Sequence, residues 1–163
     1  MDVDISKVKH IHFTGIKGIA MTALAVYAKE RGYTVTGCDT KEEFPSDEVL
    51  ASVGIKPLPG FSPDHVDGKN RPDVVIYTGA HSGRNNPEVV RAKESGIPVL
   101  AHGQALGLFM NSSRQISVAG SHGKSTTTAM IATILHRAGS DPSYAIGSGM
   151  VKGLGLPGHF GKG

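Results

Sequence analysis

The residues best suited to chemistry form one short run in the C-terminal third of the sequence. A glycine-rich loop between a strand and a helix presents backbone N–H groups to phosphate oxygens, and the helix adds the positive end of its dipole. Lys124 would then reach the β- and γ-phosphates as the catalytic residue, and the Ser125 hydroxyl would bind Mg²⁺. The sequence therefore predicts a site for ATP and Mg²⁺. Its residues are Gly120, Ser121, His122, Gly123, Lys124, Ser125 and Thr126.

The spacing of this loop differs from the common one. The usual phosphate loop reads G-x-x-x-x-G-K-[ST], whereas this sequence has Val118 where the first glycine should stand and reads G-x-x-G-K-S-T. The alternative interpretation is a glycine-rich turn with an exposed lysine. The preceding apolar segment, the glycines, the lysine and the two hydroxyls together favour the phosphate loop.

A second candidate site follows the first expected strand. A dinucleotide-binding loop reads G-x-G-x-x-G/A. Gly15 and Ala20 fit its first and third places, but Lys17 replaces the second glycine. Asp39 ends the next strand about twenty residues further on, where an acidic residue binds a ribose hydroxyl in dinucleotide-binding folds. An ordinary turn aspartate is the alternative. The candidate residues here are Gly15, Ile16, Lys17, Gly18, Ile19 and Asp39.

A third run of small residues ends the most apolar strand, DVVIY. It contains Thr78, Gly79 and Ala80. Ligands of open α/β sheets bind outside the carboxyl ends of the strands, so these residues are expected to face the same crevice as Gly15. A loop that merely turns the chain is the alternative.

Histidine and cysteine give weaker signals. His10 and His12 share a face of one strand, yet we expect no metal site, because no cysteine or acid nearby in the sequence completes a ligand set. Cys38 has no activating histidine motif and is expected to be a small buried residue.

The elements that would position these residues alternate between short apolar runs and helical patterns. This order is typical of an α/β fold with a parallel, Rossmann-like sheet. The expected strands are residues 10–14, 34–38, 73–77, 98–101, 115–119 and 144–146. The expected helices are residues 19–31, 46–52, with Ser46 as N-cap, 87–95, 104–110 and 124–138.

A polar segment, NSSR, predicts a domain boundary at residues 111–114. The expected domains are residues 1–111 and residues 112–163, the second being only the opening strand, phosphate loop and helix of a further α/β domain. Residues 147–163 hold seven glycines and no periodic apolar face, so we expect a flexible segment.

Composition excludes several classes of protein. A net charge of +3 over 163 residues is too small for a nucleic-acid or membrane-surface footprint. No apolar run approaches the ~18–20 residues of a membrane span, and the first ten residues lack the apolar stretch of a signal peptide. A single cysteine fits a reducing cytoplasm.

Taken together, these segments resemble the N-terminal part of the Mur ligase family. The resemblance covers essentially the whole chain and also accounts for the short spacing of the phosphate loop. It rests on HIHFTGIKGIAMTALA near the start, TVTGCD at the second strand, VVIYTGAH and NPE in the third region, and VAGSHGKSTTTAMI at the phosphate loop.

The resemblance implies a three-domain enzyme whose first domain binds a UDP-sugar, whose second is an ATPase and whose third binds the incoming amino acid. The implied reaction is ATP-dependent addition of L-alanine to UDP-N-acetylmuramic acid in peptidoglycan synthesis, through an acyl phosphate. The residues around Gly15, Asp39 and Thr78 would then contact the UDP-sugar, and this chain by itself is expected to bind that sugar without catalysing ligation.

Three alternatives stay open. A related muropeptide-recycling ligase adds a tripeptide to the same UDP-sugar. An NAD-binding oxidoreductase would use Gly15, Ala20 and Asp39 but leaves the 120–126 loop without a role. A different phosphate-loop enzyme could use the first domain as a sensor.

Overall fold

The computed structural model describes residues 3–111 and 114–163. Its centre is a parallel five-stranded sheet with the order β3-β2-β1-β4-β5. The α/β class with a parallel sheet is thus confirmed. The strands are β1 (His10–Thr14), β2 (Thr34–Asp39), β3 (Leu58–Pro59), β4 (Val74–Tyr77) and β5 (Val99–Ala101).

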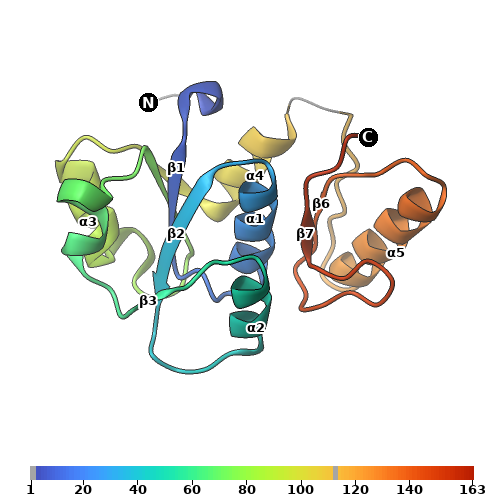
Figure 1. Cartoon of the computed structure of the whole chain (residues 1–163), viewed down its shortest axis with the longest axis horizontal. Helices are drawn as coiled ribbons and strands as arrows, with labels where there is room; N and C mark the ends of the chain where they lie inside the picture. The colour runs from blue at the N-terminus through green and yellow to red at the C-terminus, as the bar shows by residue number, and fades with distance from the viewer. Residues whose placement is uncertain (1–2, 112–113) are drawn as a thin grey trace.

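Helices cover both faces of this sheet, with α1, α2 and α4 on one side and α3 on the other (Figure 1). Alternation along β1 explains the two layers. Ile11 and Phe13 point into the larger apolar core beneath α1, whereas His12 points to the face that α3 covers. The helices are α1 (Ile19–Glu30), α2 (Pro45–Ser52), α3 (Pro87–Glu94) and α4 (His102–Met110).

The first helix is buried almost all round: every residue from Met21 to Ala28 is buried. One side of α1 packs on the sheet. Its other side receives a two-stranded antiparallel sheet formed by β6 (Tyr144–Ala145) and β7 (Gly158–His159). Small side chains permit this contact, because the backbone of Gly158 lies so close to Ala23 that a Cβ would fall 2.0 Å from the carbonyl oxygen of Ala23. The alanine-rich composition of α1 therefore allows the helix to pack closely on both the parallel sheet and the β6–β7 sheet.

The remaining helix, α5 (Lys124–Arg137), is amphipathic but largely uncovered. Only Ala132 of its fourteen residues is buried, while Met130 and Ile134 are more than half exposed. Figure 1 shows α5 on the outer side of β6 and β7, away from the parallel sheet. The second part of the chain thus reaches the first chiefly through the β6–β7 sheet.

Four sequence expectations need correction. Residues 115–119 form no strand, because they have no neighbouring strand to pair with among the described residues. Ser46 is not an N-cap, since α2 begins at Pro45 and the Ser46 hydroxyl donates to the Lys17 carbonyl oxygen at 2.7 Å. The 147–163 segment is not free of packing, because β7 lies against α1. The short strand β3 was not expected at all.

The helical ranges otherwise agree with the expectation to within two residues at each end. The proposed domain boundary falls beside residues 112–113, which lie outside the described residues.

Candidate functional site

The glycine loop lies at the carboxyl edge of the sheet, between β1 and α1. Gly15 has a φ of +81°, and a Cβ there would lie 2.5 Å from Cγ2 of Thr78. The backbone N–H groups of Gly15 and Ile16 both donate to the Cys38 carbonyl oxygen, at 2.9 and 3.0 Å. The loop therefore folds over the end of β2, and glycine is required at position 15 by both backbone conformation and space.

The start of α1 presents an open set of N–H donors. Gly18, Ile19 and Ala20 are exposed. The N–H of Gly18, the N-cap, donates to the Gly15 carbonyl oxygen at 3.3 Å, while the first N–H groups of the helix itself, those of Ile19 and Ala20, have no acceptor within the helix. The positive end of the helix dipole adds to their attraction for an anion. These exposed N–H groups could bind an anion at the place where the sequence predicts a diphosphate.

Two predicted ligand residues are engaged within the protein. The buried Asp39 carboxylate accepts hydrogen bonds from the backbone N–H of Lys17 at 2.7 Å and of Thr40 at 2.8 Å. The Lys17 ammonium donates to the Glu42 carbonyl oxygen at 2.7 Å and lies 3.0 Å from the Asp47 carboxylate. Both side chains therefore hold the loop in shape, and neither points freely into the crevice.

The loop after β4 completes the edge. Thr78 approaches Gly15, as expected, and Gly79 and Ala80 are exposed beside it. His81 and Ser82 follow with φ values of +51° and +67°, which non-glycine residues seldom adopt. Backbone strain of this kind is concentrated at ligand-binding sites.

One aromatic ring at this edge, that of Phe61, was not expected from the sequence, whereas His81 belongs to the run that begins at Thr78. The ring of Phe61, after β3, lies 5.0 Å from that of His81, centroid to centroid. His81 also places Nε2 3.5 Å from Oδ1 of Asp39. No sequence signal marked Phe61, because a lone aromatic residue in a loop has no spacing to be recognised by. Its position follows only from the pairing of β3 with β2.

The sequence led us to expect that no cysteine or acid completes a set of metal ligands with His12, and this expectation was wrong. His12, Cys38 and Glu88 place one nitrogen, one sulfur and one oxygen within 4.8 Å of one another, in the interior. They come from β1, β2 and α3, so sequence distance concealed their proximity. Cys38 is buried, as predicted. Burial and the neighbouring Glu88 charge raise the pKa of its thiol, which stays protonated.

The loop that the sequence predicts to bind phosphate directly precedes α5, and it is exposed. Gly120 and Gly123 have φ values of +148° and +77°, and Gly123 directly precedes α5. The Lys124 ammonium folds back on the loop and donates to the carbonyl oxygen of Gly120 at 2.6 Å. The Ser125 hydroxyl donates to the Gly147 carbonyl oxygen at 2.9 Å. The ammonium and the hydroxyl are of the kinds that bind phosphate and Mg²⁺, but here both are engaged with backbone carbonyl oxygens.

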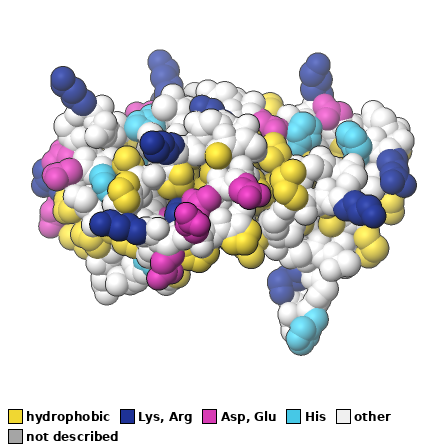
Figure 2. Space-filling model, turned by 60° about the horizontal axis from the view of Figure 1, so that its bottom comes forward, with side chains coloured by type: hydrophobic (Ala, Val, Ile, Leu, Met, Phe, Trp, Pro, Cys, Tyr) yellow, Lys and Arg dark blue, Asp and Glu magenta, His cyan; other side chains and the backbone are white. Residues whose placement is uncertain are grey.

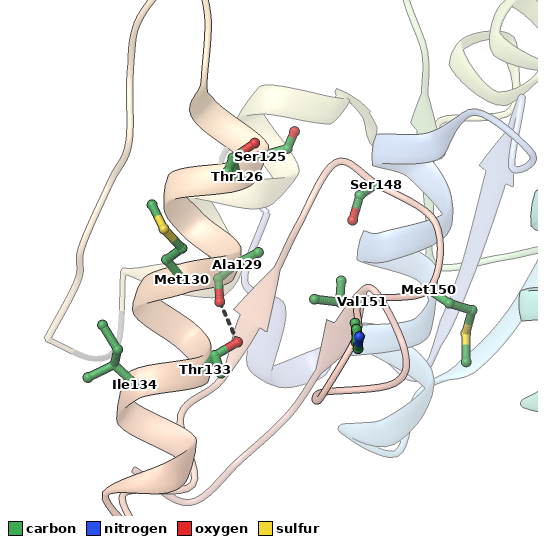
Figure 3. Close-up of a pocket in the computed structure, with 10 residues that line it drawn as sticks. Ser125, Thr126, Ala129, Met130, Thr133, Ile134, Ser148, Met150 and Val151 are labelled. Atoms are coloured by element: carbon green, nitrogen blue, oxygen red, sulfur yellow. Dashed lines mark hydrogen bonds between the residues drawn. The ribbon is translucent and has the colours of Figure 1, made fainter.

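An open groove of about 570 Å³ runs beside this loop, between α5 and the segment after β6 (Figure 3). Figure 3 shows Met130 and Ile134 on the helix and Ser148 and Val151 on the facing segment. None of its lining residues is acidic, so the groove itself supplies no carboxylate for Mg²⁺. Its lining comprises Ser125, Thr126, Ala129, Met130, Thr133, Ile134, Ser148, Met150, Val151 and Lys152.

The surface shows no concentration of one charge on the face drawn in Figure 2, where basic and acidic side chains are interspersed. Among the described residues, no helix combines the length and the apolar character that crossing a bilayer requires.

Comparison with known proteins agrees with this geometry. The family described as "Mur ligase family, catalytic domain" matches residues 10–114. The chain is 43% identical over 159 residues to a UDP-N-acetylmuramate–L-alanine ligase of Persephonella marina, covering 96% of this chain and 33% of that protein. The chain thus spans about a third of the length of this curated relative.

Two solved structures have a similar fold. A UDP-N-acetylmuramate–alanine ligase of Thermotoga maritima superimposes with a TM-score of 0.83 and 31% identity, over 96% of this chain and 35% of that one. A UDP-N-acetylmuramate:L-alanyl-γ-D-glutamyl-meso-diaminopimelate ligase of Neisseria meningitides gives a TM-score of 0.80 and 34% identity, over 93% and 46%. With the family match extending over most of the parallel sheet and its carboxyl-edge loops, the chain belongs to the Mur ligase family.

Proposed function

We propose that this chain binds UDP-N-acetylmuramic acid at the carboxyl edge of its five-stranded sheet. The observation that carries the proposal is the exposed N-terminus of α1, where Gly18, Ile19 and Ala20 lie beside the Gly15 turn. The diphosphate would accept hydrogen bonds from the N–H groups of Ile19 and Ala20, whereas the N–H of Gly18 donates to the Gly15 carbonyl oxygen at 3.3 Å. Gly79 and Ala80 leave space for the rest of the ligand, and the Phe61–His81 pair offers an aromatic surface beside it.

Within a longer protein, this chain would contribute to the ligation of L-alanine. The muramate carboxylate would attack the γ-phosphate of ATP, ADP would leave, and the amine of alanine would then displace phosphate from the acyl phosphate. Two anions must meet in the first step, so positive charge from Lys124 would stabilise the transition state. Ser125 would hold Mg²⁺, which neutralises phosphate charge when bound.

This chain alone is expected to bind the UDP-sugar without ligating it. The groove beside α5 contains no acidic residue, and 115–119 lack a partner strand. The related addition of a tripeptide is the second candidate, supported by the likeness to the Neisseria ligase. The two candidates share the UDP-sugar and differ in the incoming amine.

Calorimetric titration of this chain tests the proposal. We expect saturable binding of UDP-N-acetylmuramic acid and much weaker binding of NAD, because the Asp39 carboxylate that would bind a ribose hydroxyl is buried and occupied by the N–H groups of Lys17 and Thr40. Tighter binding of NAD than of the UDP-sugar would refute the proposal in favour of a dehydrogenase-type domain.

A further inference from the structure

A buried carboxylate close to the proposed UDP-sugar site accepts an unusually large number of hydrogen bonds. Glu88, in the first turn of α3, has no exposed surface. Its two oxygens together accept five hydrogen bonds. The donors are Thr14 Oγ1 at 2.8 Å, Cys38 Sγ at 2.7 Å, His12 Nε2 at 3.3 Å, His65 Nδ1 at 2.7 Å and the Ser62 backbone N–H at 3.3 Å.

These donors belong to three separate segments, and each segment borders the site. Thr14 immediately precedes the Gly15 loop. The Cys38 carbonyl oxygen holds the N–H groups of Gly15 and Ile16. Ser62 immediately follows Phe61, whose ring contacts His81.

The residue that caps α3 connects the same carboxylate residue to the strained turn. The Asn86 side chain accepts a hydrogen bond from the Glu88 backbone N–H at 3.0 Å and donates to the His81 carbonyl oxygen at 3.1 Å. Asn86 is itself buried. Through Glu88 and Asn86, the start of α3 therefore contacts the ends of β1 and β2 and the segments after β3 and β4.

We propose that Glu88 is a positioning residue for the UDP-sugar site, which it serves by keeping the loops after β1, β2, β3 and β4 in register. This inference rests on the proposed function and adds to it a residue that does not contact the ligand. An ionised carboxylate accepts hydrogen bonds and donates none, so all five donors can be satisfied only while the charge is present.

The charge state is consistent with this role. Burial opposes ionisation of Glu88, but the hydrogen bond from His12, electrostatic attraction to His12 and the hydrogen bonds from Cys38 and Thr14 outweigh burial and lower the pKa of the carboxyl from 4.5 to about 2. His12 Nδ1 also lies 2.9 Å from the Thr36 hydroxyl oxygen, so Thr36 of β2 belongs to the same cluster.

The same three side chains could instead bind a thiophilic metal ion such as Zn²⁺. The hydrogen bonds favour the protonated network, because the ligand atom of each residue already has a partner: His12 Nε2 and the Cys38 thiol both donate to Glu88. We therefore treat metal binding as an outcome that the experiment must distinguish.

Replacement by glutamine gives the sharpest variant. Glu88→Gln keeps the shape of the side chain but replaces one accepting oxygen with an NH₂ group. The two or three groups that donate to that oxygen would then have no acceptor. We expect the affinity for UDP-N-acetylmuramic acid, measured by calorimetry, to fall about tenfold or more, the effect of losing hydrogen bonds to a charged group. Glu94→Gln, an exposed position on the same helix, is the matched control and should leave affinity unchanged.

A second control separates positioning from stability. Val89→Ala removes a fully buried side chain of α3 that packs in the smaller core and donates to none of the four loops. It should lower the melting temperature while leaving the affinity of the folded protein unchanged. If Glu88→Gln does not fold, Thr14→Val removes one donor isosterically, and about a tenfold loss of affinity is expected for one hydrogen bond to a charged group.

The outcomes are distinguishable. Absence of binding by the unmodified chain would overturn the proposed function together with this inference. Binding by the unmodified chain and equal binding by Glu88→Gln, or by Thr14→Val in its place, would overturn the positioning role alone. Stoichiometric Co²⁺ uptake with a thiolate-to-metal absorption band, lost in Cys38→Ser, would show a metal centre and overturn it as well.

Discussion

The two parts of this chain use the same kind of strand–loop–helix unit with different support. In the first, α1 follows the Gly15 loop and has eight consecutive buried residues between the parallel sheet and the β6–β7 sheet. In the second, α5 follows the phosphate loop and has one buried residue. The free energy that apolar burial contributes rises with the area buried. The helix behind the Gly15 loop is therefore more strongly stabilised than the helix behind the phosphate loop.

The difference extends to the sites themselves. The Gly15 loop follows β1 and lies against the end of β2 and against Thr78 after β4, so its neighbours are in place before a ligand arrives. The phosphate loop has one helix behind it, and its Lys124 and Ser125 side chains bind backbone carbonyl oxygens of the protein. A binding loop is pre-organised only when packing and hydrogen bonds from neighbouring elements hold it in its binding conformation.

The largest expected effect contrasts the two helices. Leu24→Ala in α1 removes a fully buried side chain and should lower the free energy of unfolding by about 2–5 kcal/mol. Ile134→Ala in α5 removes a side chain that is 66% exposed and should change the free energy of unfolding by no more than about 0.5 kcal/mol. Urea denaturation followed by circular dichroism measures both. Equal losses would mean that α5 is as well packed as α1.

The next effect breaks the contact between the two parts. A Cβ at Gly158 would collide with the Ala23 backbone, so Gly158→Ala should weaken the docking of β7 on α1 by about 1–3 kcal/mol, the usual cost of overpacking. Hydrogen exchange of residues 140–163 should then accelerate while the parallel sheet stays protected. Gly149→Ala is the matched control, because no atom lies within 4 Å of a Cβ there. Unchanged exchange in Gly158→Ala would contradict the contact.

Much of this contrast follows from the sequence. The strands β1, β2, β4 and β5 and the helices that follow them were predictable from apolar runs and helical patterns, and Gly32, Gly54 and Gly96 marked the ends of three helices. The carboxyl-edge position of Gly15 and Thr78 followed from the geometry of parallel sheets. The strand expected over 115–119 was wrong, since a strand needs a partner and no local pattern can supply one.

Long-range pairing explains the other failures. Glu88 lies 76 residues from His12 and 50 from Cys38, so their cluster carried no signal in sequence spacing. Asp39 occupied the predicted place, yet its carboxylate binds backbone N–H groups of neighbouring loops. The glycines after residue 147 suggested flexibility, whereas Gly158 serves close backbone approach to α1.

A smaller effect concerns pH and the same contact. His159 on β7 lies 2.7 Å from the Glu30 carboxylate of α1 and 3.0 Å from that of Asp141. Partial burial lowers the pKa of His159, but hydrogen bonds to Asp141 and Glu30 raise it more, so it lies above 6.5. Protonation therefore favours docking, with the stabilisation fully present below pH 6.5 and lost as pH rises through the raised pKa.

Hydrogen exchange of β7 measured across this pH range should accelerate on the alkaline side in the unmodified chain. In His159→Gln the rates, corrected for intrinsic exchange, should no longer depend on pH in this window. Persistence of the same pH dependence in that variant would assign it to another group.

The smallest expected effect sharpens the account of the Gly15 loop. The Lys17 ammonium is paired with Asp47, and partly exposed ion pairs contribute about 0–1 kcal/mol. Lys17→Met should therefore change the affinity for UDP-N-acetylmuramic acid by less than about threefold. A loss of about 1–3 kcal/mol in binding free energy would instead mean that the ammonium turns to pair with the diphosphate.

The central claim is that this chain holds a pre-organised UDP-sugar site and an incompletely framed ATP site. Amide chemical shifts of the ¹⁵N-labelled chain, titrated in parallel with UDP-N-acetylmuramic acid and with ATP and Mg²⁺, test it most directly. The account predicts saturating shifts at Gly18, Ile19 and Ala20 with the UDP-sugar, and only weak, unsaturated shifts at Gly123 and Lys124 with ATP. Saturating shifts at the phosphate loop, with none at the start of α1, would contradict it.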